Sequence, residues 1–169
     1  DLLACEKITD GGIAHLAECP TLRELTLARH LTDAALIPLA RVPNLERLNM
    51  LYSPGITSNG LAPLRGQRSL KVLLLGAIAD KKCAEQLKYM PALEEIGFWD
   101  DRPASIEFVR GLGEVKSLKR VNFVNMKWND RSLNALQGLT QLEDLRIQQF
   151  RLEPSQLESL RSALPGCRI

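Results

Sequence analysis

The chain has 169 residues and a mass of 18.8 kDa, which favours a single domain. Its 22 lysines and arginines nearly balance its 20 aspartates and glutamates, which argues against a nucleic-acid binder, because such proteins usually carry a strong basic excess. The sequence has no apolar run of membrane-spanning length and no basic start followed by an apolar signal stretch, so neither a membrane nor a nucleic acid is an expected partner.

A leucine-rich pattern recurs along the whole chain and predicts its strands in order. The pattern Leu-x-x-Leu-x-Leu begins at positions 22, 45, 70, 93, 118 and 142, so its period is 23 to 25 residues. All of its positions are apolar: Leu22, Leu25, Leu27, Leu45, Leu48, Met50, Leu70, Leu73, Leu75, Leu93, Ile96, Phe98, Leu118, Val121, Phe123, Leu142, Leu145 and Ile147. Apolar residues that alternate in this way are typical of a strand with one buried face.

The second half of each period predicts a short helix. In the first full repeat, Leu31, Leu36 and Leu39 have the spacing of an apolar helical stripe, and the other repeats match it. Small polar residues such as Thr32 precede these stripes, where their side chains can cap the first helical turn. The third full repeat departs from the pattern with a glutamine, and its Leu87 indicates a helix that is one residue longer.

Strand–turn–helix units of this kind bury their apolar faces by stacking on one another. The pattern resembles the leucine-rich repeat family, especially the helix-backed subclass that includes ribonuclease inhibitor and many bacterial repeat proteins. The resemblance implies an α/β fold: a right-handed leucine-rich repeat solenoid with a parallel β-sheet on the concave face and short helices on the convex face. The family often has Asn or Cys at the ninth repeat position, where its side chain bonds neighbouring turns. We expect this ladder to be missing, since the position holds His30, Ser53, Ile78, Asp101, Met126 and Phe150.

The repeats predict one domain over residues 1–169. It consists of a partial repeat over 1–21, full repeats that start at 22, 45, 70, 93, 118 and 142, and a terminal cap over about 164–169. Residues 1–21 have the slots of a helix without its preceding strand, and the sequence starts at Asp1 rather than Met. We therefore expect the natural protein to continue upstream.

Charged residues alternate in sign along two outward rows of the predicted sheet. The first row is Arg23, Glu46, Lys71, Glu94, Lys119 and Glu143, and the second is Glu24, Arg47, Val72, Glu95, Arg120 and Asp144. Opposite charges on neighbouring strands attract one another. The rows predict either a self-neutralising surface that keeps the repeats in register or a charged recognition strip.

Further along the same strands the outward positions are apolar. We hypothesise that they form a partner-binding patch together with the irregular loop over 99–103, because contiguous apolar surface and aromatic anchors mark protein-binding sites. The candidate residues are Leu51, Tyr52, Val72, Leu74, Trp99, Asp100, Arg102 and Val124. The alternatives are loops that fold over the patch or scattered apolar residues. Asp100 and Asp101 have a simpler interpretation as a solvated turn.

The sequence offers little that points to catalysis or to a cofactor. Cys5, Cys19, Cys83 and Cys167 have no metal-binding or redox spacing, and we expect most of them to be small buried apolar residues. Their unpaired state favours a reducing compartment such as the cytoplasm. Neither histidine has an evident catalytic partner, and no nucleotide-binding or hydrolase motif is present. Trp128 occupies a core slot.

The sequence thus predicts a non-catalytic protein–protein interaction module that uses the concave sheet face and the adjoining loops, without a cofactor or metal. One alternative is a targeting or regulatory repeat segment of a larger multidomain protein. Another is a small-ligand binder or enzyme that uses the loop over 99–103. A third is a structural array with no specific partner, whose apolar patch would be capped or used in self-association. The partner is not identified, and a monomer is favoured.

Overall fold

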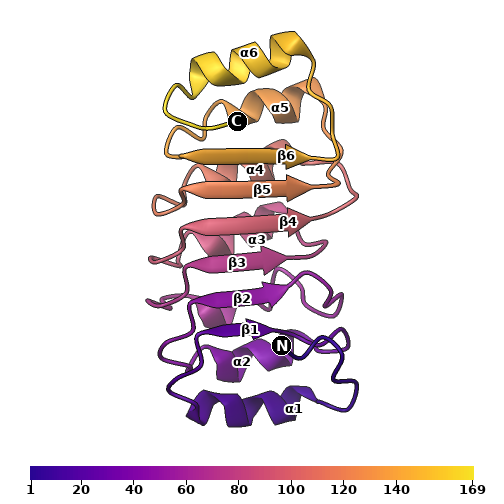
Figure 1. Cartoon of the computed structure of the whole chain (residues 1–169), viewed down its shortest axis with the longest axis vertical. Helices are drawn as coiled ribbons and strands as arrows, with labels where there is room; N and C mark the ends of the chain where they lie inside the picture. The colour runs from indigo at the N-terminus through magenta and orange to yellow at the C-terminus, as the bar shows by residue number, and fades with distance from the viewer.

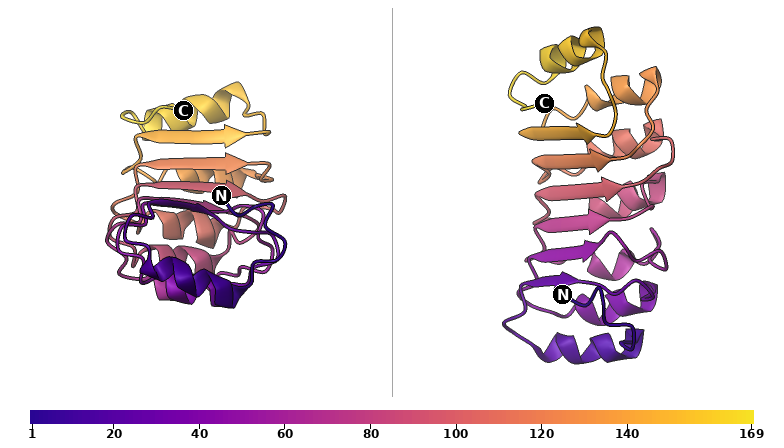
Figure 2. Two further views of the ribbon diagram at one scale, coloured as in Figure 1. Left: turned by 60° about the horizontal axis from the view of Figure 1, so that its bottom comes forward. Right: turned by 45° about the vertical axis from the view of Figure 1, so that its right-hand side comes forward.

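A computed structural model describes all of residues 1–169 as a single stack of coils (Figures 1 and 2). Six parallel strands form one sheet in the order β1-β2-β3-β4-β5-β6, so every strand pairs with the strand of the next repeat. The strands are β1 (Glu24–Thr26), β2 (Arg47–Met50), β3 (Val72–Leu75), β4 (Glu95–Trp99), β5 (Arg120–Val124) and β6 (Asp144–Gln148). Helices cover one face of this sheet, and the other face is open (Figure 2).

The strand register places the repeated leucine positions side by side. Leu25 pairs with Leu48, Leu48 with Leu73, and the series continues through Ile96 and Val121 to the last strand. We call each of these repeated apolar strand residues a rung. Each rung is buried because its side chain points from the sheet toward the helices. This register confirms the stacked repeat arrangement that the period of the sequence predicts.

The helices differ between the two halves of the stack. They are α1 (Asp10–Ile13), α2 (Leu36–Leu39), α3 (Lys81–Leu87), α4 (Ile106–Leu112), α5 (Asp130–Leu136) and α6 (Pro154–Ala163). The repeat between β2 and β3 has only a 3₁₀ turn, Ala62–Leu64, which contains Pro63. Proline supplies no amide donor, so it suits a short turn better than the interior of a helix. Leu87 ends α3 and is fully buried, but α3 has seven residues like α4 and α5, so the expectation of a longer helix is wrong.

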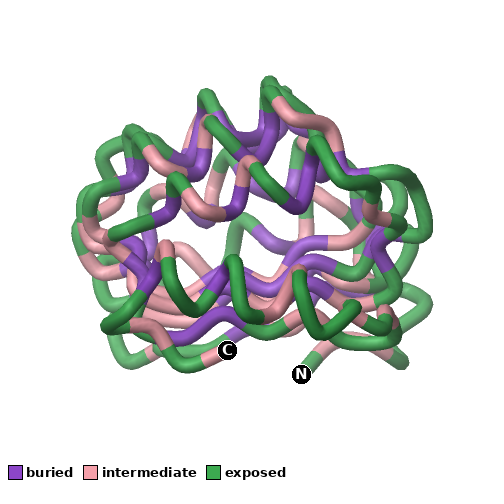
Figure 3. Tube along the Cα trace, turned by 90° about the horizontal axis from the view of Figure 1, so that it is seen from above, coloured by how far each residue is buried: buried purple, intermediate pink, exposed green.

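The core is one continuous layer of 42 buried apolar residues between the sheet and the helices (Figure 3). Its aromatic part lies in the fourth and fifth repeats. The ring centroid of Phe98 lies 4.9 Å from that of Phe108 and 5.8 Å from that of Phe123. Trp128 packs on Phe123 with centroids 4.9 Å apart, which confirms its core position, although its ring is only partly covered.

In the first repeats, side-chain hydrogen bonds join the start of one helical segment to the start of the next. Asp10 accepts from the amide and the hydroxyl of Thr32, at 2.9 and 2.6 Å. Asp33 accepts in the same way from Thr57, with both distances 2.6 Å. These hydrogen bonds stabilise the stacking on the helix side, where α1 and α2 have only four residues each.

The ladder at the ninth repeat position is present in part, so the expectation that it is missing is wrong at two positions. Ser53 is buried, and its hydroxyl donates to the carbonyl of Ala28 in the preceding repeat at 3.2 Å. His30 contacts the carbonyl of Ile8 through its Nε2 atom. A serine or histidine can thus bridge neighbouring turns in place of the Asn or Cys of the family pattern.

The cysteine prediction holds for only one residue in full. Cys83 is buried, and this burial raises the pKa of its thiol well above the usual value. Cys5 and Cys19 are exposed and Cys167 is half-buried, so the expected burial of Cys19 is wrong. Cys19 directly follows the first 3₁₀ turn, Ala14–Glu18, of which no residue is buried. None of the helices has the length and apolar character that a membrane crossing requires.

Candidate functional site

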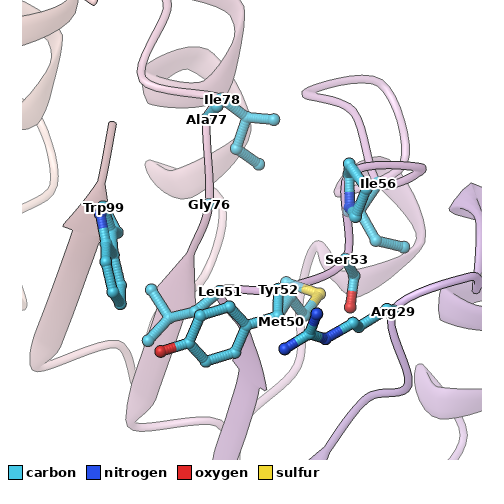
Figure 4. Close-up of a pocket in the computed structure, with 11 residues that line it drawn as sticks. Arg29, Met50, Leu51, Tyr52, Ser53, Ile56, Gly76, Ala77, Ile78 and Trp99 are labelled. Atoms are coloured by element: carbon cyan, nitrogen blue, oxygen red, sulfur yellow. The ribbon is translucent and has the colours of Figure 1, made fainter. Parts of the chain in front are cut away.

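An apolar groove lies at the carboxyl ends of β2, β3 and β4. Its volume is about 490 Å³. Three connecting segments of successive repeats form it, together with the last residue of β4 (Figure 4). The lining residues are Arg29, Met50, Leu51, Tyr52, Ser53, Pro54, Ile56, Gly76, Ala77, Ile78 and Trp99. Ile56 and Ile78 stand opposite the two aromatic side chains, which leaves a hollow between them (Figure 4).

The hollow exists because one repeat lacks a side chain at a position that the neighbouring repeats fill. Gly76 follows Leu75, the register partner of Met50, so it stands in the outward row between Leu51 and Trp99. A Cβ atom at Gly76 would lie 2.8 Å from the carbonyl oxygen of Leu51, which is closer than real Cβ contacts. The close approach of these two segments therefore requires glycine.

Two aromatic rings form one rim of the groove. Tyr52 and Trp99 meet edge to face, with centroids 5.4 Å apart and an angle of 67° between their planes. Both side chains remain exposed, at 38% and 41%. The guanidinium carbon of Arg29 lies 5.7 Å from the centroid of the Tyr52 ring. The rim thus presents flat apolar surface with one positive charge at its edge.

The loop after Trp99 supports the groove from behind. Asp100 is only 2% exposed, so the interpretation of Asp100 as part of a solvated turn is wrong. Its carboxylate accepts hydrogen bonds from the backbone amide and guanidinium of Arg102, and from the amide of Ala79 at 3.4 Å. Arg102 also donates to the carbonyl of Ala77 in the groove wall. The side chain of Asp100 is therefore a support for the wall and does not face a partner.

The pKa of Asp100 reflects this environment. Burial by itself would raise the pKa of the carboxyl group. The hydrogen bonds from Arg102 and from the Ala79 amide outweigh burial, and the net pKa lies below its usual value. Asp100 is therefore ionised at neutral pH, and its negative charge is balanced by Arg102.

The other hypothesised partner-binding residues lie outside the groove. Val72 and Leu74 are half-buried on β3, and Val124 is half-buried beside Trp99 on β5. The side chain of Leu74 lies over Gly97. A Cβ atom added at Gly97 would lie 2.8 Å from the Cδ2 atom of Leu74. The structure thus brings Leu51, Tyr52 and Trp99 together in the groove and leaves these three on the adjoining sheet surface.

Sequence reasoning missed several lining residues because all of them except Met50, the last residue of β2, lie in the connecting segments. They are Arg29, Met50, Ser53, Pro54, Ile56, Gly76, Ala77 and Ile78. One signal was available: Gly76 stands where the aligned repeats have Leu51, Trp99 and Val124. A glycine in a row of larger side chains indicates a local depression in the surface.

The charged rows pair between neighbouring strands as the alternation of sign predicts. Glu46 contacts Arg23, and its carboxylate lies 3.1 Å from Lys71. Hydrogen bonds from Lys71 and Arg23 lower the pKa of Glu46. In a second group, Arg120 lies 2.9 Å from Glu95, and Lys119 lies 3.4 Å from Glu94. These contacts show that most of this surface neutralises itself.

The same loops offer few groups for chemistry. The carboxylate of Asp100 is held by Arg102, while Asp101 is exposed. The structure holds no group of three or more His, Cys, Asp and Glu side chains placed to bind a metal ion. What the site provides is apolar contact area, two aromatic rings and one guanidinium.

The comparisons with known proteins identify the fold. No protein-family profile matches the chain, and no curated protein sequence is detectably similar to it. Among solved structures, internalin C2 from Listeria monocytogenes is 23% identical and superposes with a TM-score of 0.55, over 94% of this chain and 63% of its own length. This chain thus spans less than two thirds of that protein.

Two further structures are more distant. The tropomodulin C-terminal domain from Caenorhabditis elegans is 10% identical, with a TM-score of 0.49 over 93% of this chain and 92% of its own length. An internalin (inlF) from Listeria monocytogenes is 18% identical, with a TM-score of 0.45 over 92% of this chain and 48% of its own length. The repeated Leu-x-x-Leu-x-Leu strands, their in-register parallel sheet and the likeness to internalin C2 lead to one conclusion: the chain has the leucine-rich repeat fold.

Proposed function

We propose that the chain is a non-catalytic protein-interaction module that binds its partner through the groove at the carboxyl ends of β2, β3 and β4. The observation that carries the proposal is the pair of exposed aromatic side chains, Tyr52 and Trp99, on the rim of an apolar hollow. Aromatic side chains in apolar pockets supply a large share of the binding energy at protein interfaces. Exposed apolar surface of this kind marks interaction sites.

The mechanism is recognition by a largely preformed surface. The groove walls are held by backbone pairing of the strands and by the Asp100–Arg102 support, so few groups have to be ordered on binding. Partner side chains would displace water from Leu51, Ile56 and Ile78. The adjoining sheet face, with Val72, Leu74 and Val124, would extend the contact.

The alternative use of the loop over 99–103 in small-ligand binding or catalysis has less support. The carboxylate of Asp100 is buried against Arg102, and the exposed Asp101 is left as a single carboxylate without converging titratable groups. A role as the targeting or regulatory segment of a larger protein would use the same groove. It differs from the main proposal only in what the module is attached to.

The test is affinity capture with the purified chain, followed by binding measurements with each captured protein after it has been purified separately. Trp99→Ala should weaken a partner by at least about 1–2 kcal/mol, because it removes a central aromatic anchor. Tyr89→Ala is the matched control, since Tyr89 is also an exposed aromatic residue (52%) and does not line the groove. If captured partners bind the Trp99→Ala variant as tightly as the wild type, the groove is not the binding site.

A further inference from the structure

Arg29 is the one charged side chain that lines the groove, and it has no acidic partner. The charges that support the groove wall, by contrast, neutralise each other, because Asp100 pairs with Arg102. Arg29 is exposed and takes part in no ion pair or hydrogen bond, and its guanidinium lies over the ring of Tyr52. Its charge is therefore available to a molecule that enters the groove.

We infer that the occupant of the groove is a peptide segment of another protein that carries an apolar anchor side chain and, close to it in sequence, a carboxylate that pairs with Arg29. This inference rests on the proposed function and adds the chemistry of the partner. The apolar walls, with Ile56 and Ile78, select the anchor. The guanidinium selects the acid, because it can donate two parallel hydrogen bonds to a carboxylate.

The layout of the groove limits the spacing of these two groups. The hollow is centred on the segment after β3, where Gly76 leaves space, and Arg29 belongs to the segment after β1 (Figure 4). Strands lie about 4.8 Å apart, so the two positions are separated by about 10 Å across the sheet. An extended peptide covers this distance in about three residues. The acid should therefore lie within about three residues of the anchor.

The loss of water around Arg29 on binding makes its positive charge discriminate between acidic peptides and others. Arg29 lies beside the Tyr52 ring, so a bound peptide that covers the groove would also exclude water from the guanidinium. A segment that covered it without an acid would leave a cation poorly solvated and unpaired, which costs free energy. A basic segment would in addition be repelled.

The experiment is a phage-display selection of linear peptides on the full chain. The selected peptides are then synthesised, and their affinity is measured by fluorescence polarisation for the wild type and for Trp99→Ala, Arg29→Glu and Arg131→Glu. Arg131 is an exposed arginine on α5 that lies outside the groove, so Arg131→Glu makes the same change in net charge elsewhere. A second peptide set replaces each acid with lysine.

We expect the selected peptides to share an apolar residue with an acid within three positions. Arg29→Glu should weaken them about tenfold or more, because an attractive charged hydrogen bond becomes a repulsion. Arg131→Glu should leave them unchanged, and the lysine peptides should prefer the Arg29→Glu variant to the wild type. This reversal of preference would establish direct pairing.

Two results would overturn the inference in distinguishable ways. If Trp99→Ala weakens the peptides while Arg29→Glu leaves their affinity unchanged, the groove binds but the acid is not recognised. If the selection gives no peptide that is sensitive to Trp99→Ala, the proposed function fails, and the inference fails with it. Selected peptides without a shared acid would also contradict it.

Discussion

The two ends of the strands on the open sheet face have opposite characters. At the amino ends, charged side chains alternate in sign and contact one another across the strands, as Arg23, Glu46 and Lys71 do. At the carboxyl ends, apolar and aromatic residues surround a hollow, and the one lining charge, Arg29, lacks a partner. The first end has its interactions satisfied within the chain, whereas the second has contact area left for another molecule.

This difference teaches that a repeated scaffold can carry two unlike surfaces on the same strands. The apolar rungs that hold the strands together run beneath both ends, as Leu73 and Leu75 do in β3. Changes in the rungs should therefore affect both ends through folding. Changes in the outward residues should affect binding at one end and add little to stability at either.

The largest expected effect is on stability, from Phe98→Ala. Phe98 is fully buried and packs on Phe108 and Phe123, so its removal leaves a cavity in the aromatic part of the core. We expect a loss of about 3–5 kcal/mol in the free energy of unfolding, measured by urea denaturation. A loss below about 1 kcal/mol would show that this aromatic cluster does not stabilise the core that runs beneath both ends of the strands.

Next comes Asp100→Asn, which removes the negative charge that supports the groove wall. It leaves Arg102 without its ionic partner, so we expect a loss of about 1–3 kcal/mol in the free energy of unfolding. Partner affinity should fall as well, because Arg102 also holds the carbonyl of Ala77. The control is Asp101→Asn, since Asp101 is the exposed neighbour, and it should change neither property.

The same pair gives a pH prediction. The pKa of Asp100 is lowered on folding, so its contribution to stability is complete above the unfolded-state pKa of about 3.9 and is lost as the pH falls through the folded-state value. The stability difference between wild type and Asp100→Asn should therefore be constant near neutral pH and shrink below about pH 4. Urea denaturation of both proteins across this range measures it, and a difference that grows on acidification would contradict the assignment.

Trp99→Ala separates binding from folding. We expect partner affinity to fall by at least about 1–2 kcal/mol, while the free energy of unfolding changes by less than about 0.5 kcal/mol, because the exposed side chain adds little to the core. Isothermal titration and urea denaturation on the same preparation measure the two quantities. A large loss of stability would mean that Trp99 belongs to the fold rather than to the interaction surface.

The smallest effect should come from Glu46→Gln in the charged rows. Both of its ion pairs are exposed to solvent, and such pairs contribute little because water and salt screen them. We expect a change in Tm well below that of Asp100→Asn, and no change in partner affinity. A marked fall in affinity would mean that the charged rows form a recognition strip after all.

Periodicity was enough to predict the rungs, the sheet order and the place of each helix, but it also predicted a helix between β2 and β3, where the chain forms only the 3₁₀ turn Ala62–Leu64. It was informative because a slot such as Leu48 or Leu73 is set by burial that recurs in every repeat. Periodicity also placed Tyr52 and Trp99 near one surface, because their positions follow directly from the strands.

What could not be predicted depends on contacts between turns. The inward carboxylate of Asp100 is stabilised by an arginine two residues on and by the amide of Ala79 in the preceding repeat. The hydrogen bond from Ser53 to Ala28 likewise depends on how two neighbouring turns approach each other. Such arrangements differ from repeat to repeat, so a repeating pattern carries no signal for them.

The two tryptophans give the molecule a pair of optical reporters. Trp99 is partly exposed on the rim of the groove, while Trp128 packs on Phe123 with its indole nitrogen buried and without a hydrogen-bond partner. Emission from the first should shift to shorter wavelength when the groove is filled, and emission from the second should shift to longer wavelength only when the coils separate. Acrylamide quenching of a Trp99→Phe variant would isolate the second signal, so occupancy and unfolding could be followed in one cuvette without a label.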